Sequence, residues 1–299
     1  MSSRPVFRFA PSPNGLLHLG HAFSAFLNHE MARMSGGRFL VRIEDIDLGR
    51  ARAEFEQQIF EDLAWLGLGW EEPVMRQSDR FDVYREALGR LKALDLVYPC
   101  YATRTEIRDA VVAKGVGWPQ DPDGQPLYPG LWREATGTDL LRGKATGLPF
   151  AYRLRMDAAM RAASLDPDAA LSWTERDPGG RETVANGRPA DWGDVVIARK
   201  DVPTSYHLAV VVDDAAQGIT HVVRGQDLRA ATALHRLLQI LLDLPEPLYF
   251  HHRLIRDDGG EKLAKSRDSA SLKALRETGT LPSEIVGMLD LQAEFTAPE

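Results

Sequence analysis

Two short motifs, far apart in the sequence, carry residue types suited to holding a nucleoside triphosphate. The first contains His18, Gly20 and His21 and opens a segment with helical periodicity. A helix N-terminus offers free N–H groups and a positive dipole end, and two imidazoles three positions apart would add donors for phosphate on one face. Gly20 would leave room for a base or a ribose near the backbone.

The second motif, EKLAKSR, places Lys262, Lys265 and Ser266 after the loop sequence Asp-Asp-Gly-Gly. Ammonium groups on such a loop can close over a triphosphate and stabilise the charge that develops on departing pyrophosphate. Taken separately, either motif is more often a set of ordinary surface residues, because short patterns recur by accident. Their occurrence together in one chain favours a single ATP site.

The segment RFAPSPNGLLHLGH, which contains the first motif, resembles the class I aminoacyl-tRNA synthetases of the glutamyl and glutaminyl branch. In that family the HIGH and KMSKS signatures flank a nucleotide-binding fold. The resemblance implies that His18, Gly20 and His21 bind ATP, which is used together with Mg²⁺. It also implies a catalytic role for both histidines, because they would contact the phosphates where charge develops.

The lysine motif corresponds to KMSKS in this resemblance. Lys262 and Lys265 are then expected to be catalytic, and Lys265 and Ser266 to contact ATP. One residue departs from the usual pattern, because Ala264 stands where a hydroxyl residue commonly precedes the second lysine. This change removes one hydrogen bond that could be made to phosphate.

The resemblance also implies a pocket for L-glutamate. Its expected members are Arg8, Phe9, Ala10, Pro11, Ser12, Glu44, Tyr206 and Arg224. Glu44 would accept hydrogen bonds from the ammonium group of the ligand, beside Tyr206. Arg8 and Arg224 would each bind one carboxylate through two parallel hydrogen bonds. A guanidinium that faces the ligand's side chain favours glutamate over glutamine, because a neutral amide leaves the buried cation without a counter-charge.

Arg224 has a second interpretation, a structural salt bridge with Asp213, Asp214 or Asp227. Asp213 and Asp214 themselves are expected to be structural or helix-capping residues rather than catalytic ones.

Some members of the similar family carry a small zinc site in an insertion, with three cysteines and a tyrosine. Only Cys100 and Tyr128 match those positions here, while Ala102 and Trp132 stand at the other two. Neither alanine nor tryptophan ligates zinc. We therefore expect no zinc and no other metal-binding side chains. Hydrophobic packing by Trp132 is expected to replace the zinc site.

The acceptor of the glutamyl group is suggested by a resemblance to truncated members of the branch, the glutamyl-queuosine tRNA(Asp) synthetases. The chain ends soon after the lysine motif, which leaves no room in this sequence for an anticodon-binding domain. This implies transfer of glutamate to queuosine in the anticodon loop of tRNA(Asp). Arg153, Arg155 and Arg188 could contact its phosphates or be ordinary surface arginines.

Three alternatives stay open at this point. The first is a short glutamyl-tRNA synthetase that charges the 3′ end of tRNA(Glu). The second is a nucleotidylyltransferase, which shares an HxGH-type motif but has no use for the glutamate residues. The third is a non-catalytic module that binds glutamate or tRNA, against which the intact His18, His21 and Lys265 argue.

Alternating strand and helix patterns must position these residues. The expected strands are 6–10, 38–43, 150–156, 191–198 and 206–213, and the expected helices are 19–34, 51–66, 79–94, 230–242 and 269–289. This order predicts an α/β fold with a doubly wound parallel sheet of the class I synthetase Rossmann type, with an α+β insertion and a short helical C-terminal region. Ligand is expected at the carboxyl ends of the strands. The expected divisions are 1–100 for the first half of the catalytic domain, 101–190 for an acceptor-binding-like insertion, 191–250 for the second half, and 251–299 for the lysine loop and helical tail.

The composition is that of an ordinary globular protein of 299 residues, with a net charge of −7 and one cysteine. A single cysteine excludes an intramolecular disulfide framework. The acidic balance is unusual for a protein with a polyanionic partner, although local basic patches decide phosphate affinity. We find no run of about 20 apolar residues and no signal sequence, so a cytoplasmic protein without membrane contact is expected. We also expect a monomer.

Overall fold

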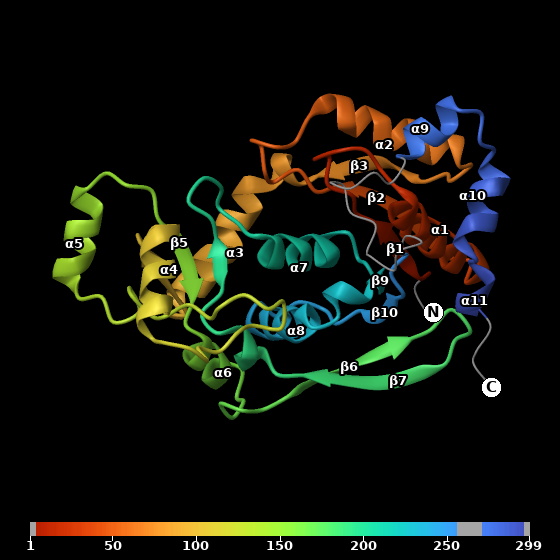
Figure 1. Ribbon diagram of the computed structural model, residues 1–299. Coiled ribbons are helices and arrows are strands. Elements are labelled where there is room, and N and C mark those ends of the chain that lie inside the picture. The colour runs from red at the N-terminus through yellow and green to blue at the C-terminus, as the bar shows by residue number, and fades with distance from the viewer. Residues whose placement is uncertain (1–3, 256–270, 296–299) are drawn as a thin grey trace.

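A computed structural model describes residues 4–255 and 271–295 of the chain (Figure 1). The predicted site residues of the second motif, Lys262, Lys265 and Ser266, lie outside the described residues. Ala264, which departs from the usual pattern of that motif, lies outside them as well.

A parallel layer forms the centre of the fold. One sheet has the order β1 (Val6–Phe9), β2 (Arg38–Ile43), β3 (Glu71–Arg76), with parallel pairing throughout. A second sheet contains the parallel pair β9 (His221–Gly225) and β10 (Leu248–His252). The two sheets are joined side by side, because hydrogen bonds connect the residue that precedes β9 to the start of β1. The predicted α/β fold with a parallel sheet is confirmed.

Helix α1 (Leu19–Met34) crosses from β1 to β2. It begins where the sequence pattern predicts, and Gly36, with φ +60°, follows its C-terminal end in a backbone conformation that favours glycine. The helix packs Phe23 and Leu27 against Phe7 of β1 in one buried cluster. Burying a side chain of this size contributes about 1.5–3 kcal/mol, so the cluster fixes the helix N-terminus relative to the strands.

The remaining helices cover the layer and extend it. They are α2 (Ala53–Trp65), α3 (Phe81–Ala93), α7 (Tyr206–Ala216), α8 (Ala231–Leu241), α9 (Leu272–Glu277), α10 (Pro282–Leu289) and α11 (Gln292–Phe295). Figure 1 shows α9, α10 and α11 beside α1 and α2, whereas α7 and α8 lie between that end and the inserted region. None of the helices in the described part of the chain combines the length and the apolar character needed to span a bilayer.

The inserted region holds a small antiparallel sheet in the order β4, β5, β8 and a long hairpin of β6 and β7. Its strands and helices are β4 (Val97–Cys100), α4 (Arg104–Ala113), α5 (Gly137–Ala145), β5 (Ala151–Leu154), α6 (Met156–Ala162), β6 (Leu171–Arg176), β7 (Glu182–Gly187) and β8 (Val196–Ala198). The hairpin runs along one side of the molecule and pairs with β10 through β6 (Figure 1). The proposed division of the chain into domains stays a prediction.

Two elements differ from the sequence expectation. Of the expected strand 191–198, only Val196–Ala198 forms a strand, β8, and residues 191–192 belong to a 3-10 helix. The segment 206–213 was expected to be a strand, but it begins α7. Residues 208–212 are apolar and all buried, because α7 packs between α3 and α8. A helix buried on several sides has no polar face, so its sequence shows no helical period and cannot be distinguished from a buried strand by pattern.

Candidate active site

Every predicted site residue within the described part of the chain lines a single cavity of about 450 Å³. These residues are Arg8, Phe9, Ala10, Pro11, Ser12, His18, Gly20, His21, Glu44, Tyr206 and Arg224. They come from the carboxyl ends of β1, β2 and β9 and from the N-terminal ends of α1 and α7. Open parallel sheets bind ligands at this edge, where the strand order reverses.

The two histidines of the first motif form the N-terminal cap of α1. The Nδ1 atom of His18 accepts from the Gly20 amide at 3.1 Å, and the Nδ1 atom of His21 accepts from the His18 amide at 3.2 Å. The ring centroids lie 3.8 Å apart. Because each Nδ1 accepts, each neutral imidazole carries its proton on Nε2 and can donate to a phosphate oxygen.

Arg8 is held by a buried carboxylate. Its Nε and Nη2 atoms donate to Asp214 at 3.0 and 3.3 Å, and its Nη1 atom reaches the Val223 carbonyl oxygen at 3.4 Å. Asp214 also accepts from Arg42 at 2.6 Å. Asp214 therefore occupies the Nε and Nη2 edge of the guanidinium, and the binding of a ligand carboxylate by Arg8 stays a prediction that would use the other edge.

The two aspartates of α7 have the structural role expected from the sequence. Asp213 is fully buried and accepts from Gln77, Arg80 and Tyr84 at 2.7 to 2.8 Å. Both aspartates lie inside the helix and not at its N-terminal cap. Burial raises the pKa of Asp214, but the Arg8 and Arg42 guanidiniums outweigh this effect and hold it below its ordinary value.

Glu44 and Tyr206 face the same cavity. Glu44 accepts from Arg42 at 3.0 Å, and its pKa is raised because burial outweighs the attraction of that guanidinium. Burial also raises the pKa of the Tyr206 phenol, so Tyr206 is a neutral hydroxyl at physiological pH. A ligand ammonium group near Glu44 would supply the counter-charge that favours its ionised form.

Arg224 has a set of partners that the sequence did not reveal. It donates from Nε to His251 at 3.3 Å, from Nη1 to His235 at 3.1 Å and from Nη2 to Thr232 at 2.8 Å. Among the described residues it forms no salt bridge, so the alternative of a structural ion pair with Asp213, Asp214 or Asp227 is not realised.

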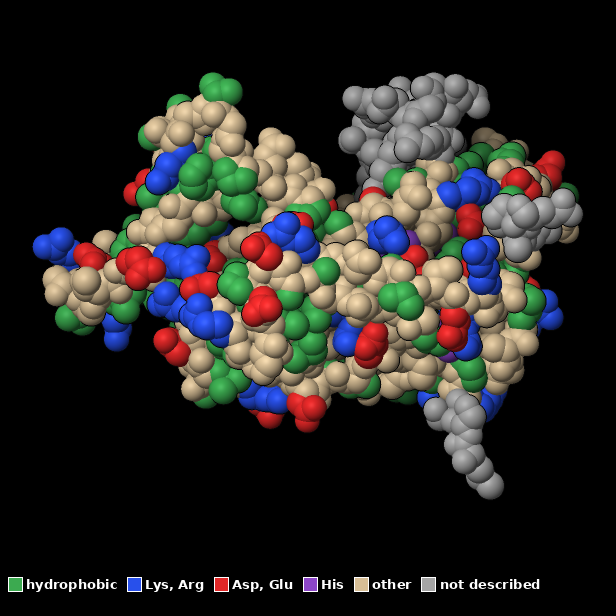
Figure 2. Space-filling model, turned by 90° about the horizontal axis from the view of Figure 1, so that it is seen from below, with side chains coloured by type: hydrophobic (Ala, Val, Ile, Leu, Met, Phe, Trp, Pro, Cys, Tyr) green, Lys and Arg blue, Asp and Glu red, His purple; other side chains and the backbone are tan. Residues whose placement is uncertain are grey.

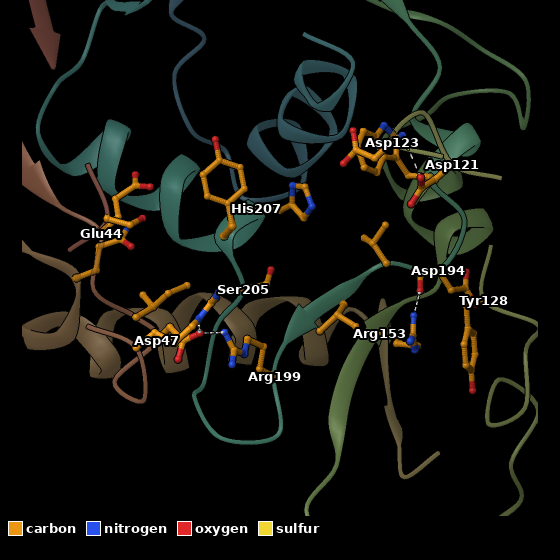
Figure 3. Close-up of a pocket in the computed structure, with 18 of the residues that line it drawn as sticks. Glu44, Asp47, Asp121, Asp123, Tyr128, Arg153, Asp194, Arg199, Ser205 and His207 are labelled. Atoms are coloured by element: carbon orange, nitrogen blue, oxygen red, sulfur yellow. Dashed lines mark hydrogen bonds and ion pairs between the residues drawn. The ribbon is translucent and has the colours of Figure 1, made fainter. Parts of the chain in front are cut away.

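A second cavity of about 500 Å³ adjoins the first and shares Ser12, Glu44 and Tyr206 with it. Figure 3 shows its other walls, with Asp121, Asp123 and Tyr128 from the inserted region facing Glu44 across the space. Asp47 accepts from Arg199 at 3.4 Å, and the Asp194 carbonyl oxygen accepts from Arg153 at 2.8 Å. The cavity is lined by both signs of charge and can hold a polar molecule beside the first cavity.

The three arginines proposed to contact tRNA differ in their surroundings. Arg153 lines the second cavity and stacks over the Tyr128 ring at 3.8 Å. Arg155 donates to the Arg133 carbonyl oxygen at 2.9 Å, and Arg188 pairs with Asp168 at 2.6 Å. On the face in Figure 2, basic and acidic side chains are interspersed. Of the three, only Arg153 lines the second cavity, which adjoins the predicted glutamate site.

The residues at the positions of the family's zinc site contact one another through uncharged groups. The Cys100 sulfur lies 3.2 Å from the Tyr128 hydroxyl oxygen, which in turn accepts from the Trp132 amide at 2.9 Å. The Trp132 ring packs on Tyr101 with centroids 5.0 Å apart. Within residues 4–255 and 271–295, no three His, Cys, Asp or Glu side chains are grouped to hold a metal ion. The absence of zinc from the protein stays a prediction.

Comparison with known proteins gives the family. The family model described as "tRNA synthetases class I (E and Q), catalytic domain" matches residues 6–294. The chain belongs to this class I synthetase family. The resemblance seen in the HLGH and lysine motifs is thereby confirmed.

Individual synthetases match along most of the chain. A protein of Rhodobacter capsulatus named "Glutamyl-Q tRNA(Asp) synthetase" is 48% identical, over 96% of this chain and 100% of its own length. A glutamate–tRNA ligase of Aquifex aeolicus is 36% identical, over 97% of this chain and 57% of its own length. The solved glutamate-tRNA synthetase of Elizabethkingia anophelis superposes with a TM-score of 0.76 at 25% identity, and the chain spans 61% of its length.

Proposed function

We propose that this synthetase activates L-glutamate with ATP and transfers the glutamyl group to queuosine in the anticodon loop of tRNA(Asp). One observation carries the activation step: every described member of the predicted ATP and glutamate sets lines the same cavity. The helix N-terminus with two imidazole donors fits a triphosphate. Glu44 and Arg224, which line the same cavity, fit an amino acid with an additional carboxylate.

In the first proposed step, an oxygen of the glutamate α-carboxylate attacks the α-phosphorus of ATP, and pyrophosphate leaves. No protein nucleophile is required, so catalysis rests on positioning and on stabilising charge. His18, His21 and the first amides of α1 would donate to the phosphates. We propose that Lys262 and Lys265, with Ser266 beside them, stabilise pyrophosphate, and that Mg²⁺ arrives bound to ATP.

In the second step, a hydroxyl of queuosine attacks the carbonyl carbon of glutamyl-adenylate, and AMP leaves. The proposed acceptor rests on the Rhodobacter relative, which is 48% identical along its whole length, against 36% for the Aquifex glutamate–tRNA ligase. We place the acceptor nucleoside in the second cavity, because that cavity shares Glu44 and Tyr206 with the glutamate site. We further propose that the protein acts as a cytoplasmic monomer.

Activation and transfer are tested by separate assays. Exchange of labelled pyrophosphate into ATP should depend on glutamate in the wild type, and Lys265→Ala should lose it. Labelled glutamate should then pass to tRNA(Asp) that contains queuosine and not to the same tRNA without it. Transfer to tRNA(Glu), or transfer that ignores queuosine, would reject the acceptor and favour the short glutamyl-tRNA synthetase. Exchange without glutamate would reject the amino-acid assignment itself.

A further inference from the structure

Arg224 lies over a buried network of neutral acceptors. Below its contacts with His235, His251 and Thr232, the Nε2 atom of His235 lies 3.1 Å from Nδ1 of His207. The Nδ1 atom of His251 lies 2.9 Å from a Glu175 carboxylate oxygen. None of these histidines was among the predicted glutamate-binding residues, because no sequence motif links their positions to Arg224.

The guanidinium of Arg224 determines the donors and acceptors of the histidines that it contacts. A guanidinium only donates, so Nδ1 of His235 and Nε2 of His251 must accept. The proton of His235 is then on Nε2 and is donated to His207, while that of His251 is on Nδ1 and is donated to Glu175. The Thr232 oxygen accepts from Arg224, so its own hydroxyl proton is available to His251 at 3.1 Å.

All three histidines are neutral at physiological pH. Burial, aided by the nearby Arg224 charge, lowers the pKa of His207 to about 4 and that of His235 well below its ordinary value. Burial also lowers the pKa of His251 to about 4, although Glu175 opposes the shift. A protonated His235 or His251 would lose the lone pair that accepts from the guanidinium.

The charge balance around the cavity separates Arg224 from the other buried arginines. Arg8 and Arg42 share the carboxylates of Asp214 and Glu44 at 2.6 to 3.0 Å. Arg224 is only 5% exposed, yet its three bonds go to uncharged atoms. Its remaining two N–H groups find no acceptor within the described part of the chain, and its side chain lines the cavity.

We propose that His235, His251 and Thr232 are positioning residues that fix the Arg224 guanidinium without neutralising it. The buried positive charge then stays available to a carboxylate of the ligand, and a ligand with a neutral amide in that place leaves it uncompensated. The three residues thereby set the preference for glutamate over glutamine. This inference rests on the proposed function, since it names the residues that make the glutamate site selective.

The test is a pair of variants that differ in charge and not in shape. In His235→Gln, a neutral amide oxygen can still accept from Arg224 and the amide nitrogen can still donate toward His207. In His235→Glu, a carboxylate of the same size neutralises Arg224. We expect His235→Glu to raise the KM for glutamate in pyrophosphate exchange by about tenfold or more over His235→Gln. The KM for ATP should agree within about twofold between the two variants.

The second measurement is discrimination between amino acids. The ratio of kcat/KM for glutamate to that for glutamine should fall by about tenfold or more in His235→Glu relative to His235→Gln. A purely structural role for His235 predicts equal ratios, or parallel losses for glutamate and ATP. Equal KM values for glutamate in two folded variants would overturn the proposal.

A second pair keeps the proposal testable if His235→Glu does not fold. Thr232→Asn and Thr232→Asp place a neutral and a charged group at the Nη2 atom of Arg224, and the same difference is expected. Calorimetric binding of glutamate to the wild type without ATP separates the two levels of inference. If the wild type does not bind glutamate, the proposed function is rejected. If the wild type binds glutamate but the neutral and charged variants of each pair have the same KM for glutamate, only the role of the neutral network is rejected.

Discussion

At the scale of single residues, Gly20 lies between the two imidazoles that cap α1. A Cβ atom built on Gly20 would come within 3.0 Å of Cε1 and 3.2 Å of Nδ1 of His18. The ring of His18 would have to shift by a few tenths of an ångström, which weakens its hydrogen bond to the Gly20 amide. The glycine therefore favours the observed position of the His18 ring.

Gly20→Ala should separate activity from stability. Alanine favours a helix over glycine by about 0.5–1 kcal/mol, which offsets part of the strain, so the free energy of unfolding should change by less than about 1 kcal/mol. The KM for ATP should rise and kcat/KM should fall by about tenfold, because the imidazole is displaced. Urea unfolding and pyrophosphate exchange measure the two quantities. Wild-type kinetics would show that the orientation of His18 is unimportant.

The site residues were predicted unevenly from the sequence, for a physical reason. His18, Gly20 and His21 lie within the first turn of one helix, so their spacing in the sequence is enough to predict that they are close together. The pairing of Arg8 with Asp214 joins residues 206 positions apart, and no local pattern contains it. The histidines around Arg224 were missed in the same way, since each looks like an ordinary core residue in its own segment.

At the scale of elements, the strands and helices near the N-terminus follow the sequence closely. The helix at 19–34 and the strand at 38–43 are found at the expected bounds, because a clear apolar period is interrupted by Ser-Gly-Gly between them. Helix α7 was mistaken for a strand because its apolar run is buried on several sides. The error left the placement of Tyr206 intact, since it is the first residue of the element under either assignment.

Helix α7 is fastened to the sheet through Asp214. Replacing this carboxylate in Asp214→Asn leaves Arg8 and Arg42 sharing one fewer buried counter-charge, with Arg42 fully buried. Removing one partner of a buried pair typically costs about 3–5 kcal/mol. We expect a loss of that size in the free energy of unfolding, measured by urea titration at pH 7. A loss below about 1 kcal/mol would show that Glu44 alone satisfies both arginines.

At the scale of the whole molecule, buried neutral histidines make stability depend on pH. The folded pKa values of His207 and His251 are about 4, below the ordinary value of 6.5. Their contribution is therefore complete above about pH 6.5 and is lost as the pH falls towards 4. Asp62 opposes this trend, because burial raises its pKa to about 6 and its protonation favours the folded state.

Glu44, Asp123 and Glu294 also have raised pKa values and act in the same direction as Asp62. Among the described residues the histidines with lowered pKa values still outnumber these four carboxyls, so acidification should destabilise the protein; they are His207, His221, His235, His251 and His252. The free energy of unfolding should decrease between pH 7 and pH 5, measured by urea titration at constant ionic strength. His207→Gln should show a shallower decrease, because one depressed imidazole is gone. An unchanged free energy over this range in the wild type would contradict the assignment of neutral buried histidines.

The wall shared by the two cavities has a consequence for the order of events. A small molecule resting against Ser12, Glu44 and Tyr206 in the first cavity becomes part of the surface that the second cavity presents. A ligand that binds later in the second cavity then contacts both the protein and the ligand bound in the first cavity. Thermodynamic reciprocity requires each ligand to change the affinity of the other by the same factor. The affinity of the second cavity for its ligand therefore depends on whether the first cavity is occupied.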